Sequence, residues 1–374
     1  MARSVVRTLV VVMALAASAA VAQTEGGPDW AGSWQSGPTT GFLYSRIDGA
    51  YVESTGLVYF LGGRQGDNTL GDIWSFNPAT GTYADTGVDM VTPISNYTIN
   101  VLNDATGDGL YVFCGRDAAG GQTFAVQVYY PATNTAVQLP PADNYPGPVS
   151  CSSALNVVVN NKVYVAGGFD GTANSSETWV FDPTAPSGSR WTRLASADLP
   201  QGLAYIMGAA VDNKVYAIGG AFYDETSTIC GQLLCNVTTV QVLDPAAPTP
   251  SWTTLAPLPE ECSSSRAWGF DTGSLYIDPT DMTPLDGTII SGCGWWPTEN
   301  ERVYAYTVAT NTWEVFPSLQ IIRRDMAGEF VPLAGEPALW IWGGRSGLDD
   351  PPVDSSEYYS LALIPVELQS FTIE

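Results

Sequence analysis

Short apolar runs alternate with turn residues along the whole chain, and one order of these segments recurs. Over residues 57–83, an apolar run leads to a glycine pair, a polar turn, a second alternating run, an Asn-Pro turn and an aromatic residue. The glycine-pair position returns six times. Its copies are Gly62-Gly63, Cys114-Gly115, Gly167-Gly168, Gly219-Gly220, Cys293-Gly294 and Gly343-Gly344. A recurrence with a period of roughly 50 residues predicts a repeat architecture.

Each repeat holds enough apolar runs for four short strands. One run precedes the glycine pair, a further run lies upstream of that (for example residues 49–52 and 208–211), and two more follow. The last run often begins with an aromatic residue, such as Tyr83, Trp191 or Trp313. No stretch sustains the 3.6-residue period of a helix, so we expect an all-β fold with almost no helix. Six units of four strands predict a β-propeller.

These motifs resemble the kelch repeat. The shared features are the apolar run, the Gly-Gly pair, the variable loop, the aromatic residue with Asp-Pro or Asn-Pro, and a tryptophan several residues later. The resemblance covers about residues 30–363 and implies a six-bladed kelch-type β-propeller. Kelch propellers serve as enzymes, scaffolds and sugar binders, so the resemblance leaves the function open.

The sixth repeat lacks its last strand, whereas a strand-like segment around Trp34 precedes the first repeat. Trp34 stands as far before Arg46 as Trp191 stands before Leu203. We therefore expect the N-terminal strand to complete the last blade, which would close the ring and remove its open sheet edges.

The two ends of the chain are expected to lie outside the propeller. Residues 1–22 carry Arg3 and Arg7, a short apolar stretch and a terminal Ala-Val-Ala, as a cleaved signal peptide does. The alternative is a membrane anchor, for which the apolar stretch is short. The propeller is assigned to residues 23–363. Residues 364–374 form a tail that resembles the PVEL-x-SF linker before a C-terminal β-domain in some secreted bacterial proteins. The expected location is secreted or at the cell surface, or else in the periplasm.

The chain is strongly acidic. It has 38 Asp and Glu, 14 Lys and Arg, no His and a formal charge of −24. This balance argues against nucleic acid or anionic lipid as a partner, because both require basic patches. A hydrated acidic surface like that of halophilic proteins explains the charge, and predicts that salt stabilises the fold. No membrane span is expected, and the protein is expected to be a monomer.

Six cysteines in an exported chain suggest disulfides. The repeat register favours Cys262–Cys293, because these residues lie at one end of neighbouring antiparallel strands. Cys114–Cys151 joins equivalent ends in adjacent repeats, and Cys230–Cys235 closes an inserted loop. The alternative is a metal site, which the absence of His and of a C-x-x-C spacing disfavours.

Several kinds of chemistry are excluded by composition. Copper radical oxidases of the kelch type hold their metal with His, and Ser-His-Asp and Cys-His nucleophiles also need it. No Asp box of the sialidases and no phosphate-binding glycine loop is present. We expect no metal, no cofactor and no assignable catalytic residue.

The scarce arginines are the leading candidates for ligand binding. Arg46, Arg266 and Arg324 stand near the starts of inner strands. Arg64, Arg116 and Arg345 follow the glycine pair in repeats one, two and six, which become neighbours when the ring closes. Arginine captures carboxylates with two parallel hydrogen bonds, so these residues predict a cationic mouth for an acidic sugar or a carboxylate-bearing peptide. The alternative is a set of ion pairs between blades.

Aromatic residues and two insertions complete the list of candidates. Trp295, Trp296, Phe222 and Tyr223 follow glycine pairs at the same end as the arginines, where they would stack on sugars, hold a protein or pack over the loop. Residues 223–236 and 278–286 exceed the repeat period. We expect a non-catalytic propeller that binds a protein or glycan through this loop face. The alternative is a His-independent lyase, epimerase or hydrolase acting on an acidic sugar.

Overall fold

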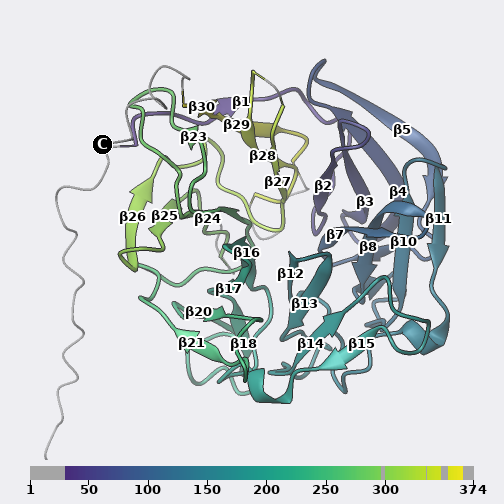
Figure 1. The fold of residues 1–374 in the computed structure, drawn as a ribbon. Coiled ribbons are helices and arrows are strands. Elements are labelled where there is room, and N and C mark those ends of the chain that lie inside the picture. Colours follow the sequence, from purple (N-terminus) through teal and green to yellow (C-terminus); the bar gives the residue numbers. More distant parts are fainter. Residues whose placement is uncertain (1–29, 296–299, 334, 347–352, 365–374) are drawn as a thin grey trace, which may run out of the picture.

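The computed structural model describes residues 30–295, 300–333, 335–346 and 353–364. The expected signal peptide, Trp296 and residues 365–374 of the tail lie outside the described residues. Six four-stranded antiparallel sheets surround a central axis (Figure 1). Helix is limited, in the described part, to the short 3₁₀ turns Pro141–Asp143 and Ala195–Ala197. The predicted six-bladed β-propeller is confirmed.

Every blade runs from an inner strand at the axis to an outer strand at the rim. Blades one to three comprise β2 (Gly49–Val52), β3 (Leu57–Gln65), β4 (Asn68–Asn77) and β5 (Thr82–Asp89); β7 (Ile99–Asp104), β8 (Gly107–Phe113), β10 (Val126–Tyr130) and β11 (Thr135–Gln138); and β12 (Leu155–Val159), β13 (Lys162–Ala166), β14 (Thr178–Phe181) and β15 (Trp191–Arg193).

The second half of the ring repeats this order. Its blades comprise β16 (Met207–Val211), β17 (Lys214–Ile218), β20 (Val240–Leu243) and β21 (Trp252–Thr254); β22 (Ala267–Phe270), β24 (Thr288–Gly292), β25 (Val303–Thr307) and β26 (Thr312–Phe316); and β27 (Ala327–Val331), β28 (Ala338–Trp342), β29 (Ser356–Ser360) and β1 (Gln35–Ser36).

Side-chain burial explains why these residues form these strands. The inner strands β12 and β16 alternate between buried and half-buried positions, whereas β24 and β28 are buried at every position because blades cover both faces. The apolar faces meet between blades, where aromatic rings such as Phe76 and Trp342 pack with centroids 5.6 Å apart. The core is therefore a set of layers between blades.

Ring closure takes place in blade six, as predicted. β1 pairs with β29, with Gln35 opposite Tyr358. Trp34 is 1% exposed, and its indole Nε1 donates to the carbonyl of Pro317 at 2.8 Å. β29 ends at Ser360, and the following strand β30 (Ala362–Leu363) leaves the blade to pair with β23 (Tyr276–Ile277).

The insertion over residues 278–286 fastens both ends of the described chain. The buried Asp278 accepts hydrogen bonds from the Tyr359 hydroxyl (2.5 Å) and the backbone N–H of Gly32 (3.2 Å). Asp281 accepts a further bond from the N–H of Ala31 at 3.0 Å. Together with the β23–β30 pair, these contacts make the insertion a structural clamp.

The glycine pairs allow neighbouring blades to approach closely. Gly167 has φ +79°, and a Cβ at this position would lie 2.3 Å from the carbonyl oxygen of Leu203 in the segment that leads to the next blade. Only glycine fits such a contact without a shift of the backbone. The pairs are thus part of the fold.

Candidate functional site

A closed ring of backbone hydrogen bonds surrounds the axis at one face of the propeller. Each blade contributes one residue, which stands a few residues before the inner strand. Its N–H donates to the carbonyl of the equivalent residue in the preceding blade, over 2.7–3.1 Å. We call this ring the crown. Its members are Arg46, Asn96, Ser153, Tyr205, Ser264 and Asp325.

All six crown residues have a left-handed backbone, with φ between 53° and 61°. This conformation is unfavourable for residues other than glycine. Its repetition in six blades indicates that the closed hydrogen-bond ring compensates for the strain. The crown therefore presents six side chains from a rigid platform at the centre of the loop face.

Four of these side chains interact around the crown, and Asn96 Nδ2 donates to Ser153 Oγ at 3.5 Å. The Arg46 guanidinium donates to Asn96 Oδ1 at 3.3 Å and lies 3.8 Å from Asp325 Oδ2. Burial raises the pKa of the neighbouring Tyr205 hydroxyl, and Arg46 opposes this shift. The centre of the loop face thus combines one cation, one carboxylate and one neutral phenol.

The structure brings Arg64, Arg116 and Arg345 to the edge of the crown. Each lies in a backbone bridge with the residue that directly precedes a crown residue. These bridges are Ser45–Arg64, Ser95–Arg116 and Arg324–Arg345. All three arginines are half-buried. We call these three residues together with Arg46 the arginine cluster.

The positive charges of the arginine cluster repel one another. The pKa of Arg64 is lowered by burial and then by the charges of Arg46 and Arg116. The pKa of Arg345 is lowered by burial and then by Arg324 and Arg46. Acidic neighbours oppose this repulsion: Asp67 pairs with Arg64 (2.7 Å) from a fully exposed position, where solvent screens the pair, and Asp325 raises the pKa of Arg345. An anion from solution would relieve the remaining repulsion.

Arg266 and Arg324 have different surroundings from the cluster. Arg266 passes beneath the crown, donates to the carbonyls of Met326 (2.9 Å) and Ile47 (2.8 Å), and forms an ion pair with Asp48 (3.1 Å). Arg324 is 2% exposed and pairs with Asp325 at 2.9 Å. The Arg266 ion pair agrees with the alternative of ion pairs between blades, whereas Arg324 pairs with the next residue in its own blade.

Aromatic residues lie beside the crown on the side away from the arginine cluster. We call the crown, the arginine cluster and these aromatic residues together the mouth. Tyr223 packs against Phe169 with ring centroids 5.5 Å apart, and its N–H donates to Asn174 Oδ1. Trp295 is half-buried, has φ 72° and donates its N–H to the carbonyl of Ser263. Phe222 is half-buried in the core between blades. The mouth therefore has a cationic half on blades one, two and six and an aromatic half on blades three to five.

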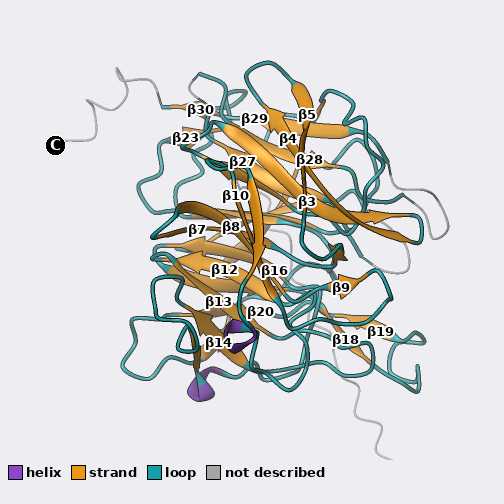
Figure 2. Cartoon of the chain, turned by 90° about the vertical axis from the view of Figure 1, so that its right-hand side faces the viewer, coloured by secondary structure: helices purple, strands orange, loops and turns teal. Residues whose placement is uncertain are grey.

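The insertion over residues 223–236 forms a hairpin beside this aromatic half. Its strands β18 (Ala221–Tyr223) and β19 (Leu234–Asn236) lie on the same side of the ring as β9 (Arg116–Asp117), which pairs with β6 (Ile94–Ser95), whereas β23 and β30 lie on the other side (Figure 2). The Cys230–Cys235 disulfide closes the hairpin. The mouth is thus bordered by an ordered loop.

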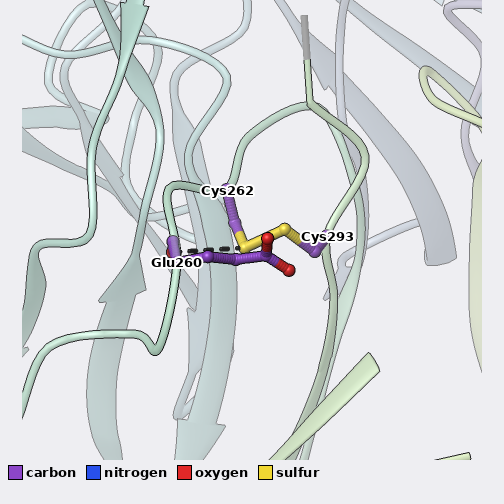
Figure 3. A group of neighbouring side chains, drawn as sticks. All are labelled: Glu260, Cys262 and Cys293. Atoms are coloured by element: carbon purple, nitrogen blue, oxygen red, sulfur yellow. Dashed lines mark hydrogen bonds between the residues drawn. A yellow bond between two sulfur atoms is a disulfide. The ribbon is translucent and has the colours of Figure 1, made fainter. Parts of the chain in front are cut away.

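The structure joins the three predicted cysteine pairs, Cys114–Cys151, Cys230–Cys235 and Cys262–Cys293. Glu260 and the third pair are grouped within 4.8 Å (Figure 3). Both sulfurs of this group belong to the disulfide, and Glu260 accepts hydrogen bonds from Tyr304 and Arg302. The group therefore offers no thiolate to a metal ion.

Below the crown, the six inner strands enclose a central channel of about 440 Å³. The charged residues among its described lining are Asp48, Arg266 and Glu329. Glu329 Oε1 accepts the N–H of Phe330 at 2.9 Å, and Oε2 accepts that of Tyr51 at 3.4 Å. Burial, followed by the charge of Asp48, raises the pKa of Glu329 to about 8.

This raised pKa predicts a pH-dependent effect of Glu329→Gln. The unfolded chain releases the Glu329 proton near pH 4.5 and the folded chain near pH 8, so the wild type loses stability as the pH rises between these values. The variant is expected to gain up to a few kcal/mol relative to the wild type over this window, with no further gain above it. Denaturant unfolding at several pH values measures the difference, and a constant difference from pH 4 to 9 would refute the assignment.

The sequence identified the arginine cluster but missed most of the crown. Asn96, Ser153, Tyr205, Ser264 and Asp325 differ in type, so no motif marks them. Only their position could have identified these residues, because each stands shortly before the inner strand of its repeat. Phe169 was also missed, although it directly follows the glycine pair of its repeat.

A family model for the KLHDC2/KLHL20/DRC7 Kelch-repeats domain matches residues 48–269. The chain belongs to the kelch-repeat family. A solved structure described as "Structure of YjhT" matches this kelch propeller with a TM-score of 0.61 at 17% identity, over 85% of this chain and 95% of that chain. At this identity the match shows the fold alone. No curated protein matches the sequence.

The kelch propeller fold fits a binding or scaffold role. Its three disulfides are consistent with an extracellular or periplasmic location. Within the part of the chain that the structure describes, no helix has the length and apolar character needed to cross a membrane.

Substitution of cluster arginines separates ligand binding from a structural role. Because Arg64 and Arg116 repel each other, Arg64→Gln and Arg116→Gln are expected to change the free energy of unfolding by less than about 1 kcal/mol. Thermal unfolding measures the effect, and Arg266→Gln is the comparison that should destabilise the fold. A loss at Arg64 or Arg116 as large as that at Arg266 would assign the cluster to inter-blade ion pairs.

Proposed function

We propose that this kelch propeller is an exported, non-catalytic binding module that captures a carboxylate-bearing glycan or protein segment at its loop-face mouth. The observation that carries the proposal is the convergence of Arg46, Arg64, Arg116 and Arg345 at the crown of a chain whose formal charge is −24. The arginines repel one another there, although Arg46 and Arg64 also pair with Asp325 and Asp67. Their concentration on an otherwise acidic protein favours a ligand that supplies the negative charge.

The aromatic half of the mouth can contact the uncharged part of the same ligand. Aromatic faces stack on sugar rings or on apolar peptide side chains, and Tyr223, Phe169 and Trp295 lie across the crown from the arginines. A ligand that places its carboxylate on the cluster can therefore extend its ring or side chain over these residues. Net acidity elsewhere would repel anions from the rest of the surface, so recognition would depend on the mouth.

A combined glycan and peptide array tests the proposal. The mature protein is expected to retain uronic-acid or sialic-acid glycans, or peptides with exposed carboxylates, and to ignore their neutral counterparts. Arg64→Gln/Arg116→Gln should lose these signals, whereas a charge change remote from the mouth, such as Lys162→Gln, should not. Retention of neutral ligands alone would contradict the proposal. A parallel activity screen on acidic polysaccharides tests the enzyme alternative, and turnover of a retained glycan would replace the binding role with catalysis.

A further inference from the structure

The central channel contains a carboxyl group, that of Glu329, which forms no ion pair with a described residue. Asp48 has three donors, because its oxygens accept Arg266, the N–H of Gly49 (2.9 Å) and the N–H of Ile99 (2.9 Å). Arg266 is in turn neutralised by Asp48. Glu329, by contrast, meets only two backbone N–H groups and forms no ion pair with any described residue. The channel therefore has one uncompensated acidic group.

The surroundings of Glu329 leave room for a ligand. The wall of the channel includes eight glycine and alanine residues, among them Gly49, Ala50, Ala267 and Gly328. Glu329 itself is only half-buried, so part of its surface faces the cavity. A volume of about 440 Å³ lies within the range of small-molecule sites.

The wall also offers hydrogen-bond acceptors without a donor. The inner strands are sheet edges, which expose unpaired backbone N–H and C=O groups. Asn156 Oδ1, on the channel-lining strand β12, is buried without a hydrogen-bond partner. A positively charged donor in the channel can therefore meet both the Glu329 carboxylate and an unpaired acceptor such as the Asn156 amide oxygen.

From this arrangement we infer that the channel is a second binding site, separate from the mouth, which takes a small organic ammonium ion with its charged nitrogen on Glu329. A divalent metal fits less well, because calcium requires six to eight oxygen ligands and usually several carboxylates. Asp48 is already saturated, which leaves a single carboxylate. One carboxylate, several carbonyls and an apolar wall are what an alkylammonium needs.

The inference has a consequence for pH. The charged groups around Glu329 are Asp48, before β2, and Arg266, before β22, and Tyr51 lines the channel beside them. Tyr97 interacts with Asp48 and Arg266, and burial raises the pKa of its hydroxyl, so it stays neutral in the relevant range. Below about pH 8, ammonium binding must displace the proton of Glu329. The affinity should therefore weaken about tenfold for each pH unit below that value.

Titration calorimetry with n-butylammonium chloride tests the site. The mature protein is expected to bind about 100-fold more tightly at pH 9 than at pH 6, with release of one proton per ligand at the lower pH, seen as a dependence on buffer ionisation heat. Glu329→Gln should weaken binding at pH 9 at least tenfold. Glu336→Gln, an exposed change after the same strand, should leave the affinity unchanged.

Other outcomes would overturn the inference. These are equal affinity at pH 6 and pH 9 in the wild type, equal weakening by Glu329→Gln and Glu336→Gln, or binding of calcium chloride with no binding of butylammonium. The wild-type pH series requires no variant, so it decides the question even if Glu329→Gln does not fold.

Discussion

Trp34→Ala is expected to lower the free energy of unfolding by about 3–5 kcal/mol, the range for removal of a buried tryptophan. Trp34 is 1% exposed in the core between blades five and six, where its ring lies 6.2 Å from that of Trp268 and 5.7 Å from that of Tyr359. Its backbone carbonyl also accepts the Gln320 side-chain amide at 2.6 Å. The substitution removes this packing and weakens the strand pair that closes the ring.

Urea unfolding followed by fluorescence and circular dichroism measures the effect. Val315→Ala serves as the control, because Val315 is 59% exposed on the outer strand of the adjacent blade and should change stability by less than about 0.5 kcal/mol. Equal midpoints for Trp34→Ala and Val315→Ala would mean that closure by the N-terminal strand contributes nothing to stability.

Asp48→Ala is expected to cost about 3 kcal/mol, because it leaves Arg266 largely buried without its partner. The Asp48 carboxylate joins blades one, two and five through Arg266 and the N–H of Ile99. Burial raises the pKa of Asp48, while Arg266 and the backbone donors oppose that shift. The ion pair therefore ties distant blades together beneath the crown.

Thermal and urea unfolding of Asp48→Ala and of Asp67→Ala provide the comparison. Asp67 is also paired with an arginine, but it is fully exposed, and its removal should have no measurable effect. If both variants unfold at the wild-type midpoint, the Arg266–Asp48 pair does not contribute to the stability of the ring.

The architecture was accessible from the sequence because the propeller is a repeat. Six copies of one pattern fixed the blade number, and the orphan segment around Trp34 fixed the closure. Two of the three disulfides followed from the same register, since equivalent positions in neighbouring repeats lie at the same end of the strands, whereas Cys230–Cys235 was predicted as a local closure of the inserted loop. The clamp over residues 278–286 was not foreseen, because an insertion by definition has no counterpart in the other repeats.

The functional surface could be predicted only in part, because several of its residues have no equivalent in the other repeats. Arg64, Arg116 and Arg345 share a position relative to the glycine pair, so the repeat revealed them. Arg266 precedes an inner strand, as Arg46 does. It nevertheless pairs with Asp48, 218 residues earlier in the sequence, and only the folded ring brings the two together. Glu329 gave no signal among the many acidic residues, because its character depends on burial in the channel.

The central claim is that the mouth recognises negative charge through the arginine cluster. The most direct test is the affinity of the wild type for an array-selected acidic ligand and for the same ligand with its carboxylate converted to an amide or methyl ester. The account predicts that the acid binds at least tenfold more tightly, that salt weakens its binding, and that Arg64→Gln/Arg116→Gln removes the difference. Equal affinity of the wild type for the charged and neutral forms would contradict it.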